Sequence, residues 1–250
     1  QEAEPEEKIK IGTIGPLTGD VASYGVSTKN GVEIAVDEFN QSGGINGRPV
    51  HLISEDTRGE QTEAANAASK LIERDEVVAI VGGVITAETM TAGPITNDAQ
   101  VVMISSSSTA VGVPEIGDYV FRNCLSDEVQ AVQLAEYAVD ELGLKKFAIM
   151  YTQNDYGVSL KDAFEEKARE LAEVTGIETY NDGDVDFRAQ LTKLKGQNPD
   201  ALYIAGYYTE AAKIAQQAKD QDLNVQFLGA DGFYSPVLVE LGGDAIEDAV

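Results

Sequence analysis

Apolar residues at strand spacing and at helix spacing alternate along the first half of the chain. Residues 9–14 alternate as a half-buried strand does, and Val32, Ala35, Val36 and Phe39 recur at the spacing of one helix face. Further strands are predicted at 50–54, 77–81 and 101–104. Of the helices between them, one carries Ala64, Ala67, Ala68, Leu71 and Ile72 on one face, and another begins near Ala87. Strands that alternate with helices in this way predict a parallel, doubly wound sheet.

The second half repeats this pattern after a change of rhythm at residues 114–126. Strands are predicted at 147–151, 177–180, 201–205 and 226–229. Three helices are predicted from apolar stripes: one at Ala131, Leu134, Ala135, Ala138 and Leu142, one at Leu160, Ala163, Phe164, Ala168 and Leu171, and one at Ala211, Ile214, Ala215 and Ala218. A further helix is predicted to begin at about Phe187. The predicted fold class is α/β, with two lobes at 8–124 and 125–250. Ligands of open α/β sheets bind at the carboxyl ends of the strands, so we expect these ends to face a common cleft.

Charge excludes two classes of partner. Acidic residues outnumber basic ones 43 to 18, which gives a formal net charge of −25. Such a surface repels phosphate backbones and anionic lipid, so neither nucleic acid nor a membrane surface is an expected partner.

Composition also limits the covalent and membrane chemistry. The single cysteine, Cys124, excludes an internal disulfide, and no apolar run has the length of a membrane span. Residues 1–7 are acidic, contain a proline and show no periodicity. They predict a flexible leader, left where a signal or anchor segment was removed.

The run Ser105-Ser106-Ser107-Ser108-Thr109 follows a predicted strand and first suggests nucleophiles. A serine nucleophile needs a base within reach, yet the one histidine, His51, starts a different predicted strand. The sequence has no G-x-S-x-G elbow, no phosphate loop at 15–19 and no zinc-ligand spacing. We therefore expect neither an enzyme nor a metal or cofactor site.

Small polar or aromatic residues follow five of the predicted strands. Each alone could be an ordinary loop residue, but together they predict a site for a small polar ligand. They are Thr86, the run Ser107-Ser108-Thr109, Tyr156, Tyr207 and Asp231.

An ordered series of motifs carries a resemblance to a known family. The motifs are Gly15-Pro16-Leu17-Thr18-Gly19, Tyr24-Gly25, Asn40-Gln41-Ser42-Gly43-Gly44-Ile45-Asn46-Gly47, Asp155-Tyr156-Gly157, Asp186-Phe187 with Leu191 and Leu194, Asn198-Pro199-Asp200 and Gly229-Ala230-Asp231-Gly232. The series resembles the periplasmic branched-chain (Leu/Ile/Val) amino-acid-binding proteins, which are type I solute-binding proteins of ABC transporters. The resemblance runs from Ile9 to Val250. It implies two Rossmann-like lobes, joined by three crossover strands, that close like a hinge on the ligand.

The resemblance also implies roles for particular residues. The ligand's carboxylate would be held by Thr86, Ser108 and Thr109, and its ammonium group by Ser107, Thr109 and Asp231. N–H groups at helix starts suit a carboxylate, and a buried ammonium needs a compensating acid. Aromatic contacts would come from Tyr24, Tyr156 and Tyr207.

The sequence departs from the family pattern at two of these positions. Thr86 stands where a serine is usual, and Asp231 where the best-known leucine-binding members carry a longer glutamate. Family chains also usually run well beyond 250 residues, so the first lobe's sheet is expected to lack its later strands and the fold its C-terminal part.

The resemblance favours a non-enzymatic, extracytoplasmic binding protein for a branched-chain or other aliphatic α-amino acid. It would work as a monomer in the periplasm or at the cell surface, held there by a lipid anchor on the removed N-terminal segment, and deliver its ligand to ABC permease subunits. The alternative keeps the fold but makes the chain the ligand-sensing domain of a receptor or regulator, for an amino acid, amide, urea or aromatic acid.

Overall fold

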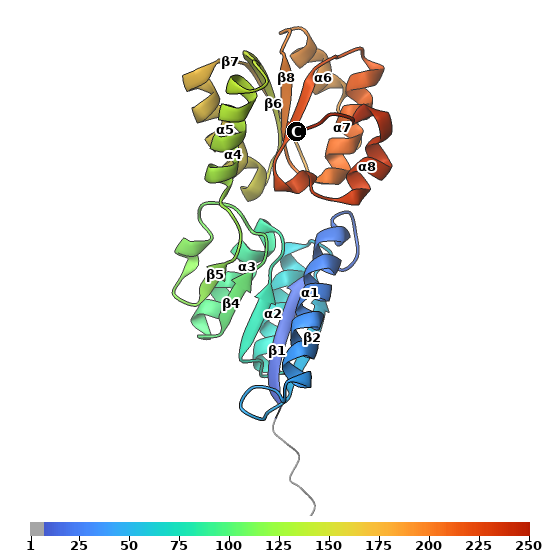
Figure 1. Cartoon of the computed structure of the whole chain (residues 1–250). Coiled ribbons are helices and arrows are strands. Elements are labelled where there is room, and N and C mark those ends of the chain that lie inside the picture. Colours follow the sequence, from blue (N-terminus) through green and yellow to red (C-terminus); the bar gives the residue numbers. More distant parts are fainter. Residues whose placement is uncertain (1–7) are drawn as a thin grey trace, which may run out of the picture. The chain divides into compact units, whose positions relative to one another are not determined.

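The computed structural model describes residues 8–250, so the leader expected at residues 1–7 lies outside it. The described chain divides into two compact units, and the boundary falls between Cys124 and Leu125 (Figure 1). Within residues 8–250, no helix has both the length and the apolar character that a membrane crossing requires.

The first unit is built on a parallel sheet with the strand order β2-β1-β3-β4-β5. The predicted parallel α/β architecture is therefore confirmed for this unit. The short strand β5 was not predicted, because three residues are too few to show a period. The elements are β1 (Ile9–Gly15), α1 (Ala22–Gln41), β2 (Val50–Asp56), α2 (Gln61–Glu73), β3 (Ala79–Gly82), α3 (Thr86–Asp98), β4 (Val102–Ser105), η1 (Pro114–Ile116) and β5 (Val120–Arg122).

Helix α1 lies on one face of this sheet, and α2 with α3 on the other. A Cβ on Gly12 of β1 would lie 2.7 Å from Leu71 of α2, whereas the neighbouring Ile11 faces the α1 side. Successive side chains of a strand point to opposite faces, so the two helices flank β1. The core on the α2–α3 side is well filled, by Ile14, Ala67, Ala68, Leu71, Val77, Ile80, Ala92 and Met103.

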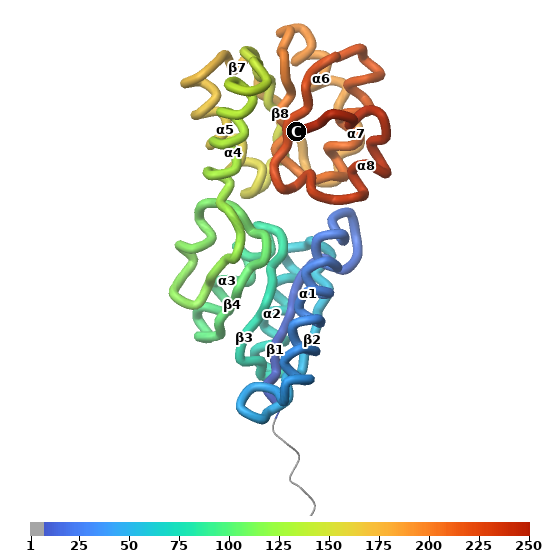
Figure 2. Tube along the Cα trace, viewed as in Figure 1, coloured from blue at the N-terminus to red at the C-terminus, as the bar shows by residue number. Residues whose placement is uncertain are grey.

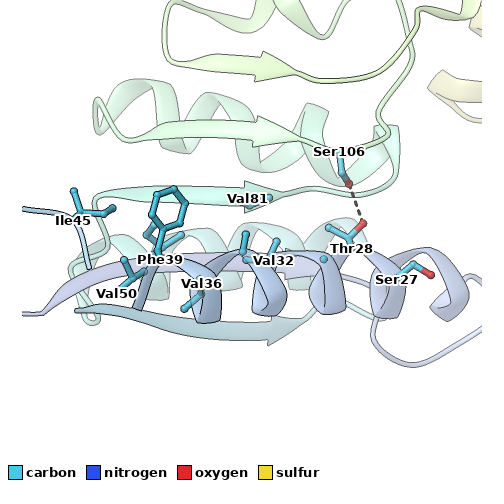
Figure 3. A pocket seen from close by; sticks show the side chains of 12 residues that line it. Ser27, Thr28, Val32, Val36, Phe39, Ile45, Val50, Val81 and Ser106 are labelled. Carbon is cyan, nitrogen blue, oxygen red and sulfur yellow. Dashed lines mark hydrogen bonds between the residues drawn. The ribbon is translucent and has the colours of Figure 1, made fainter. Parts of the chain in front are cut away.

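The α1 side of the sheet is only partly covered. Ile104 of β4 is 39% exposed and Phe121 of β5 is 49% exposed. An apolar groove of about 480 Å³ lies between α1 and the sheet. Figure 3 shows Val32 and Phe39 of α1 projecting toward the strand that carries Val81. The helix face predicted from the sequence therefore exists, but as one wall of a groove.

The second unit is built on a parallel sheet with the order β7-β6-β8-β9. Val250 lies beside β9, since its N–H donates to Phe227 O and its own carbonyl accepts from Gly229 N. Figure 2 shows this end of the chain, marked C, within the second unit. The elements are α4 (Asp127–Asp140), β6 (Lys146–Thr152), α5 (Asp155–Leu171), β7 (Glu173–Tyr180), α6 (Arg188–Lys195), β8 (Ala201–Ala205), α7 (Tyr208–Asp220), β9 (Gln226–Gly229), η2 (Asp231–Phe233), α8 (Pro236–Gly242) and η3 (Gly243–Ala245).

Both faces of the second sheet are covered. Helices α4 and α5 lie on one side, and α6 and α7 on the other (Figure 1). Phe164 of α5 stacks on Tyr203 of β8 with the ring centroids 4.0 Å apart, and meets Phe147 of β6 edge-on. All five residues of β8 are buried. This is the expected environment of an uninterrupted apolar run in a parallel sheet.

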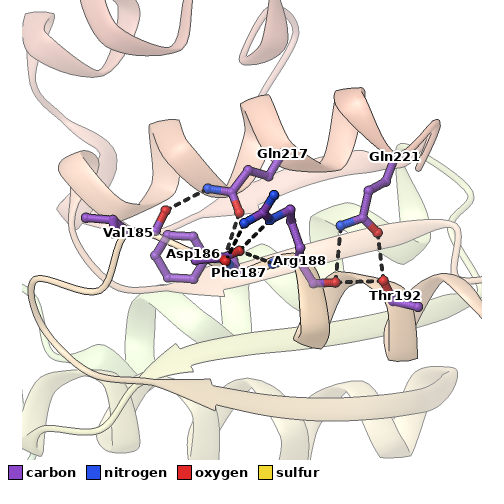
Figure 4. Close-up of polar contacts among 7 residues, drawn as sticks. All are labelled: Val185, Asp186, Phe187, Arg188, Thr192, Gln217 and Gln221. Carbon is purple, nitrogen blue, oxygen red and sulfur yellow. Dashed lines mark hydrogen bonds and ion pairs between the residues drawn. The ribbon is translucent and has the colours of Figure 1, made fainter.

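Hydrogen bonds connect the start of α6 to α7. Gln217 accepts from Phe187 N (2.7 Å) and donates to Val185 O (2.9 Å), while Arg188 forms a two-pronged ion pair with Asp186 (Figure 4). This ion pair holds the pKa of Asp186 well below its usual range. Asp186 is exposed, and its ion pair with Arg188 orders the start of α6.

Candidate functional site

The serine run after β4 is tied to the loop after β3. Ser105 Oγ donates to Gly83 O (2.6 Å), and Ser107 Oγ donates to Val84 O (2.6 Å). Ser108 Oγ lies 3.1 Å from Gly83 O and 2.7 Å from Thr89 Oγ1. The serine hydroxyls thus hold two neighbouring strand ends in a fixed relation.

Two threonine hydroxyls at these strand ends remain without a partner. Thr86 is the first residue of α3, and Thr109 follows the serine run; each is 1% exposed. Neither Oγ1 has a hydrogen-bond partner among the described residues. The carbonyl of Thr109 is fixed by Arg122, whose guanidinium donates to it at 2.7 Å. A buried hydroxyl without a partner is costly, so a ligand or a water that satisfied both would be well placed here.

A buried carboxylate organises the loop before Thr86. Glu88 is fully buried, and its Oε2 accepts from Val84 N (2.9 Å) and Ile85 N (3.3 Å). The hydroxyl of Thr57, at the end of β2, donates to its Oε1. Burial raises the pKa of Glu88 to about 6, against the lowering effect of these hydrogen bonds, and the charge of Asp56 adds to the rise.

A second carboxylate organises the loop after β1. Asp56 Oδ1 accepts from Leu17 N (2.9 Å) and Arg58 N (2.9 Å), and its Oδ2 accepts from the hydroxyl of Thr18 (2.6 Å). These hydrogen bonds hold the pKa of Asp56 below its ordinary value, against a burial effect that raises it. Asp56 and Glu88 together connect the loops that follow β1, β2 and β3.

Tyr24 lies in the first turn of α1 and is half-buried. The next residue, Gly25, brings this turn against the backbone of Pro16, where a Cβ would collide with the Pro16 carbonyl. Glycine is therefore required for this close approach, and it fixes where Tyr24 stands.

In the second unit, Asp231 is the centre of a hydrogen-bond cluster at the end of β9. Tyr156, in the first turn of α5, donates to Asp231 Oδ1 at 2.8 Å and accepts from Gly232 N at 2.9 Å. Gln130 of α4 accepts from Asp231 N at 3.1 Å. Burial raises the pKa of Asp231, although hydrogen bonds from Tyr156 and Gln130 oppose the rise. A buried acid with a raised pKa favours a cation beside it.

The aromatic residues of this unit form one wall. Tyr207 directly precedes α7, and its ring stacks on that of Tyr156 with centroids 5.0 Å apart and planes 9° apart. Both are nearly buried. A stacked pair of tyrosines offers a flat apolar surface beside the acid.

The structure therefore groups the predicted residues within each unit. Thr86, Ser107, Ser108 and Thr109 share the ends of β3 and β4, whereas Tyr24 lies after β1. Tyr156, Tyr207 and Asp231 are in contact in the second unit. Within residues 8–250, no group of three or more His, Cys, Asp or Glu side chains is placed to hold a metal ion.

Sequence reasoning missed Glu88, Thr57 and Gln130. Glu88 stands three residues after Ile85 and reaches back to its N–H, which is half of a capping box. That spacing was a usable signal, but a glutamate in a helix usually indicates a solvent-facing residue. Gln130 carried no comparable signal.

The chemistry of the two groups differs. The first unit offers buried hydroxyls at a helix start, which suits an anion, and the second offers a buried carboxyl, which suits a cation. Neither group contains an activated nucleophile.

Comparisons with known proteins show which proteins this chain is similar to. A Leu/Ile/Val-binding protein of Rhizobium johnstonii is 35% identical over 95% of this chain, and the chain spans 65% of that relative's length. A leucine-binding protein of Thermotoga maritima is 36% identical and superposes with a TM-score of 0.88, covering 96% of this chain and 68% of that one. A branched-chain amino acid transporter substrate-binding protein of Streptococcus pneumoniae, solved with isoleucine, is 33% identical with a TM-score of 0.89, over 95% of this chain and 68% of that one.

The family itself follows from a match that covers all of the described residues. The sequence profile described as "Periplasmic binding protein" matches residues 8–250. The relatives are named as binding proteins, and the fold of both units is that of the type I class. The chain belongs to the periplasmic binding protein family.

Proposed function

We propose that this chain is part of an extracytoplasmic solute-binding protein of an ABC transporter, and that it binds an aliphatic α-amino acid such as leucine. The observation that carries the proposal is the pair of buried, unpartnered hydroxyls, Thr86 Oγ1 and Thr109 Oγ1, at adjacent strand ends. They would donate hydrogen bonds to the ligand's carboxylate, and the start of α3 would favour its negative charge.

The ammonium group would be held by Asp231 of the second unit. Its side chain is already oriented by Tyr156, and burial favours a positive partner for it. The stacked Tyr156 and Tyr207 would pack against an apolar side chain. Ligand binding would shift the population of the two units toward a closed state by hinge motion.

The proposed function implies a location and partners for the protein. The protein would act outside the cytoplasm as a monomer and hand its ligand to ABC permease subunits. A lipid anchor would keep it at the membrane.

Calorimetric melting of the purified chain with each of the twenty amino acids tests the proposal. Leucine, isoleucine or valine at about 100 times its Kd should stabilise the protein by about 2.7 kcal/mol, and the shift should follow mass action. Leucine analogues that lack either the amine or the carboxylate should give no shift at the same concentration. A panel in which no amino acid shifts the transition would refute the proposal.

Asp231→Asn is the decisive variant. Removing one charge of a buried pair costs roughly 2–5 kcal/mol, so leucine affinity should fall by about 30-fold or more. The matched control is Asp155→Asn, an exposed acid in the same turn of α5 as Tyr156, which should bind normally. Full leucine affinity in the Asp231 variant would show that Asp231 does not hold the ammonium group. A wild-type chain that binds aromatic acids but no amino acid would favour the rival function, a sensing domain for a ligand without an amine.

A further inference from the structure

We propose that Glu88 couples ligand capture to the uptake of one proton, so that the first unit binds the ligand's carboxylate most tightly when Glu88 is neutral. This inference rests on the proposed function, because it places the ligand's carboxylate at Thr86. It adds a residue that does not itself contact the ligand.

The geometry puts Glu88 and Thr86 on the same helix start. The carboxyl of Glu88 accepts hydrogen bonds from the N–H groups of Val84 and Ile85, the two residues that precede Thr86. A helix start attracts negative charge within its first turn. An ionised Glu88 already supplies that charge from inside the protein, so it opposes a second carboxylate at the same place.

The neutral form of Glu88 fits the same hydrogen bonds. Thr57 faces Oε1, and a hydroxyl can donate a hydrogen bond or accept one. A proton on Oε1 can therefore be donated to Thr57, while Oε2 continues to accept from Val84 and Ile85. Protonation removes the charge and leaves the loop before Thr86 held in place.

The surroundings of Glu88 make this proton exchange accessible. The pKa is already about 6, mainly because of burial, and Asp56 at the end of β2 is the charged group that raises it further. The residues that α2 buries are uncharged: Ala64, Ala67, Ala68 and Leu71. On α3 itself, the remaining acid is Asp98 at the far end of the helix, which is exposed. The charged group that acts on the pKa of Glu88 is thus an acid, Asp56, and it does not offset the charge of an ionised Glu88.

The sign of the pH dependence follows. A ligand carboxylate raises the pKa of Glu88, so binding takes up a proton and affinity increases as the pH falls from 8 to 6. A rise of one pKa unit corresponds to about tenfold in affinity. Asp231 has the opposite requirement, since it must be ionised to hold an ammonium group, and burial raises its pKa.

Titration calorimetry with L-leucine tests the proposal. Binding is measured at pH 6, 6.5, 7 and 8, and at pH 6.5 in two buffers with different enthalpies of ionisation, which gives the number of protons taken up. The wild-type protein should take up about half a proton at pH 6.5, the value for a one-unit shift from a pKa of about 6. Its affinity should rise roughly threefold to tenfold from pH 8 to pH 6.

Glu88→Gln imitates the neutral acid and should abolish both effects. Its amide oxygen can accept from Val84 and Ile85, and its amide nitrogen can donate to Thr57. It should bind leucine at pH 8 up to about tenfold more tightly than the wild type. The matched control is Glu210→Gln, a buried acid with a raised pKa in the second unit, which should keep the proton uptake.

The outcomes separate this inference from the proposed function. Leucine binding without proton uptake, or proton uptake that persists in Glu88→Gln, would overturn the role of Glu88 and leave the binding function intact. If the wild type bound no amino acid at any pH, both would fall together. Loss of proton uptake in Glu210→Gln alone would assign the proton to the other unit and also refute the role of Glu88.

Discussion

Helices α1 and α7 each follow a central strand of their unit, yet they are buried to very different extents. Of the twenty residues of α1, all of them described, only Gly25 is buried. Eight of the thirteen residues of α7 are buried, among them Tyr208, Ile214 and Ala218. Helix α7 packs between α6 and α8, whereas α1 lies on its face of the sheet with an apolar groove beside it. An amphipathic pattern therefore predicts which face turns inward, but the neighbouring elements decide how far that face is covered.

Strands β4 and β8 show the same difference in burial between the two units. β4 and β8 are both short apolar runs in parallel sheets, but Ile104 of β4 is 39% exposed while Ile204 of β8 is 0% exposed. A strand covered on both faces needs apolar residues at every position. The sequence of β4 has the composition of such a strand, although the described part of the first unit covers only one of its faces.

Replacing Ile104 and Ile204 by alanine should give the largest difference in lost stability between the two units. Ile204→Ala removes fully buried methyl groups and leaves a cavity, which costs about 2–5 kcal/mol. Ile104→Ala removes groups that are already partly in water and should cost about 1 kcal/mol or less. Hydrogen exchange of peptides from β4 and β8 measures each unit separately. Equal losses in the two variants would contradict the contrast between the strands.

The two buried glutamates should give a smaller, pH-dependent difference. The pKa of Glu88 is raised from 4.5 to about 6, so its stabilising contribution is complete below pH 4.5 and lost as the pH rises through 6. Without ligand, Glu88→Gln should therefore be more stable than the wild type by about 2 kcal/mol at pH 8, and equal to it at pH 4. Urea unfolding at the two pH values measures this.

Glu210 provides the comparison within the second unit. Its pKa is also raised by burial, so Glu210→Gln should change stability in the same direction. Its carboxyl accepts a hydrogen bond from its own backbone N–H in the first turn of α7 and another from Gly183 N of a neighbouring loop. A destabilising effect of either glutamine at pH 8 would show that the charge, and not its burial, dominates at that position.

Gly31→Ala should give the smallest effect, and it should be stabilising. A Cβ at Gly31 would meet nothing within 4 Å, and alanine favours a helix interior by about 1 kcal/mol over glycine. The variant should raise the midpoint of urea unfolding. A loss of stability would mean that α1 is more tightly packed than its exposure indicates.

The sequence predicted the architecture because the period of its apolar residues is clear. The run Ala201–Ala205 and the stripe at Ala211, Ile214, Ala215 and Ala218 lie where they were expected. The first turns of α1, from Ala22 onward, were missed, since the apolar stripe that marks this helix begins only at Val32. Helix α8 was missed because seven residues are too few for a helical period to stand out.

The sequence predicted that the candidate residues follow the ends of strands, but not the hydrogen bonds that connect them. Thr86, Thr109 and Asp231 follow from their positions after strands, and their roles from the family resemblance. That the serine hydroxyls bond to Gly83 and Val84 depends on how β3 and β4 pair, which no local pattern contains. The burial of Glu88 likewise depends on Thr57, thirty-one residues earlier in the chain.

The apolar groove beside α1 has a practical consequence for the assays. Environment-sensitive dyes used to follow melting fluoresce when they enter apolar cavities, and a groove lined by Val32, Val36 and Phe39 offers such a cavity in the native protein. We expect a high dye signal before any unfolding takes place. The chain contains ten tyrosines and no tryptophan, so calorimetry or tyrosine fluorescence gives a cleaner melting curve.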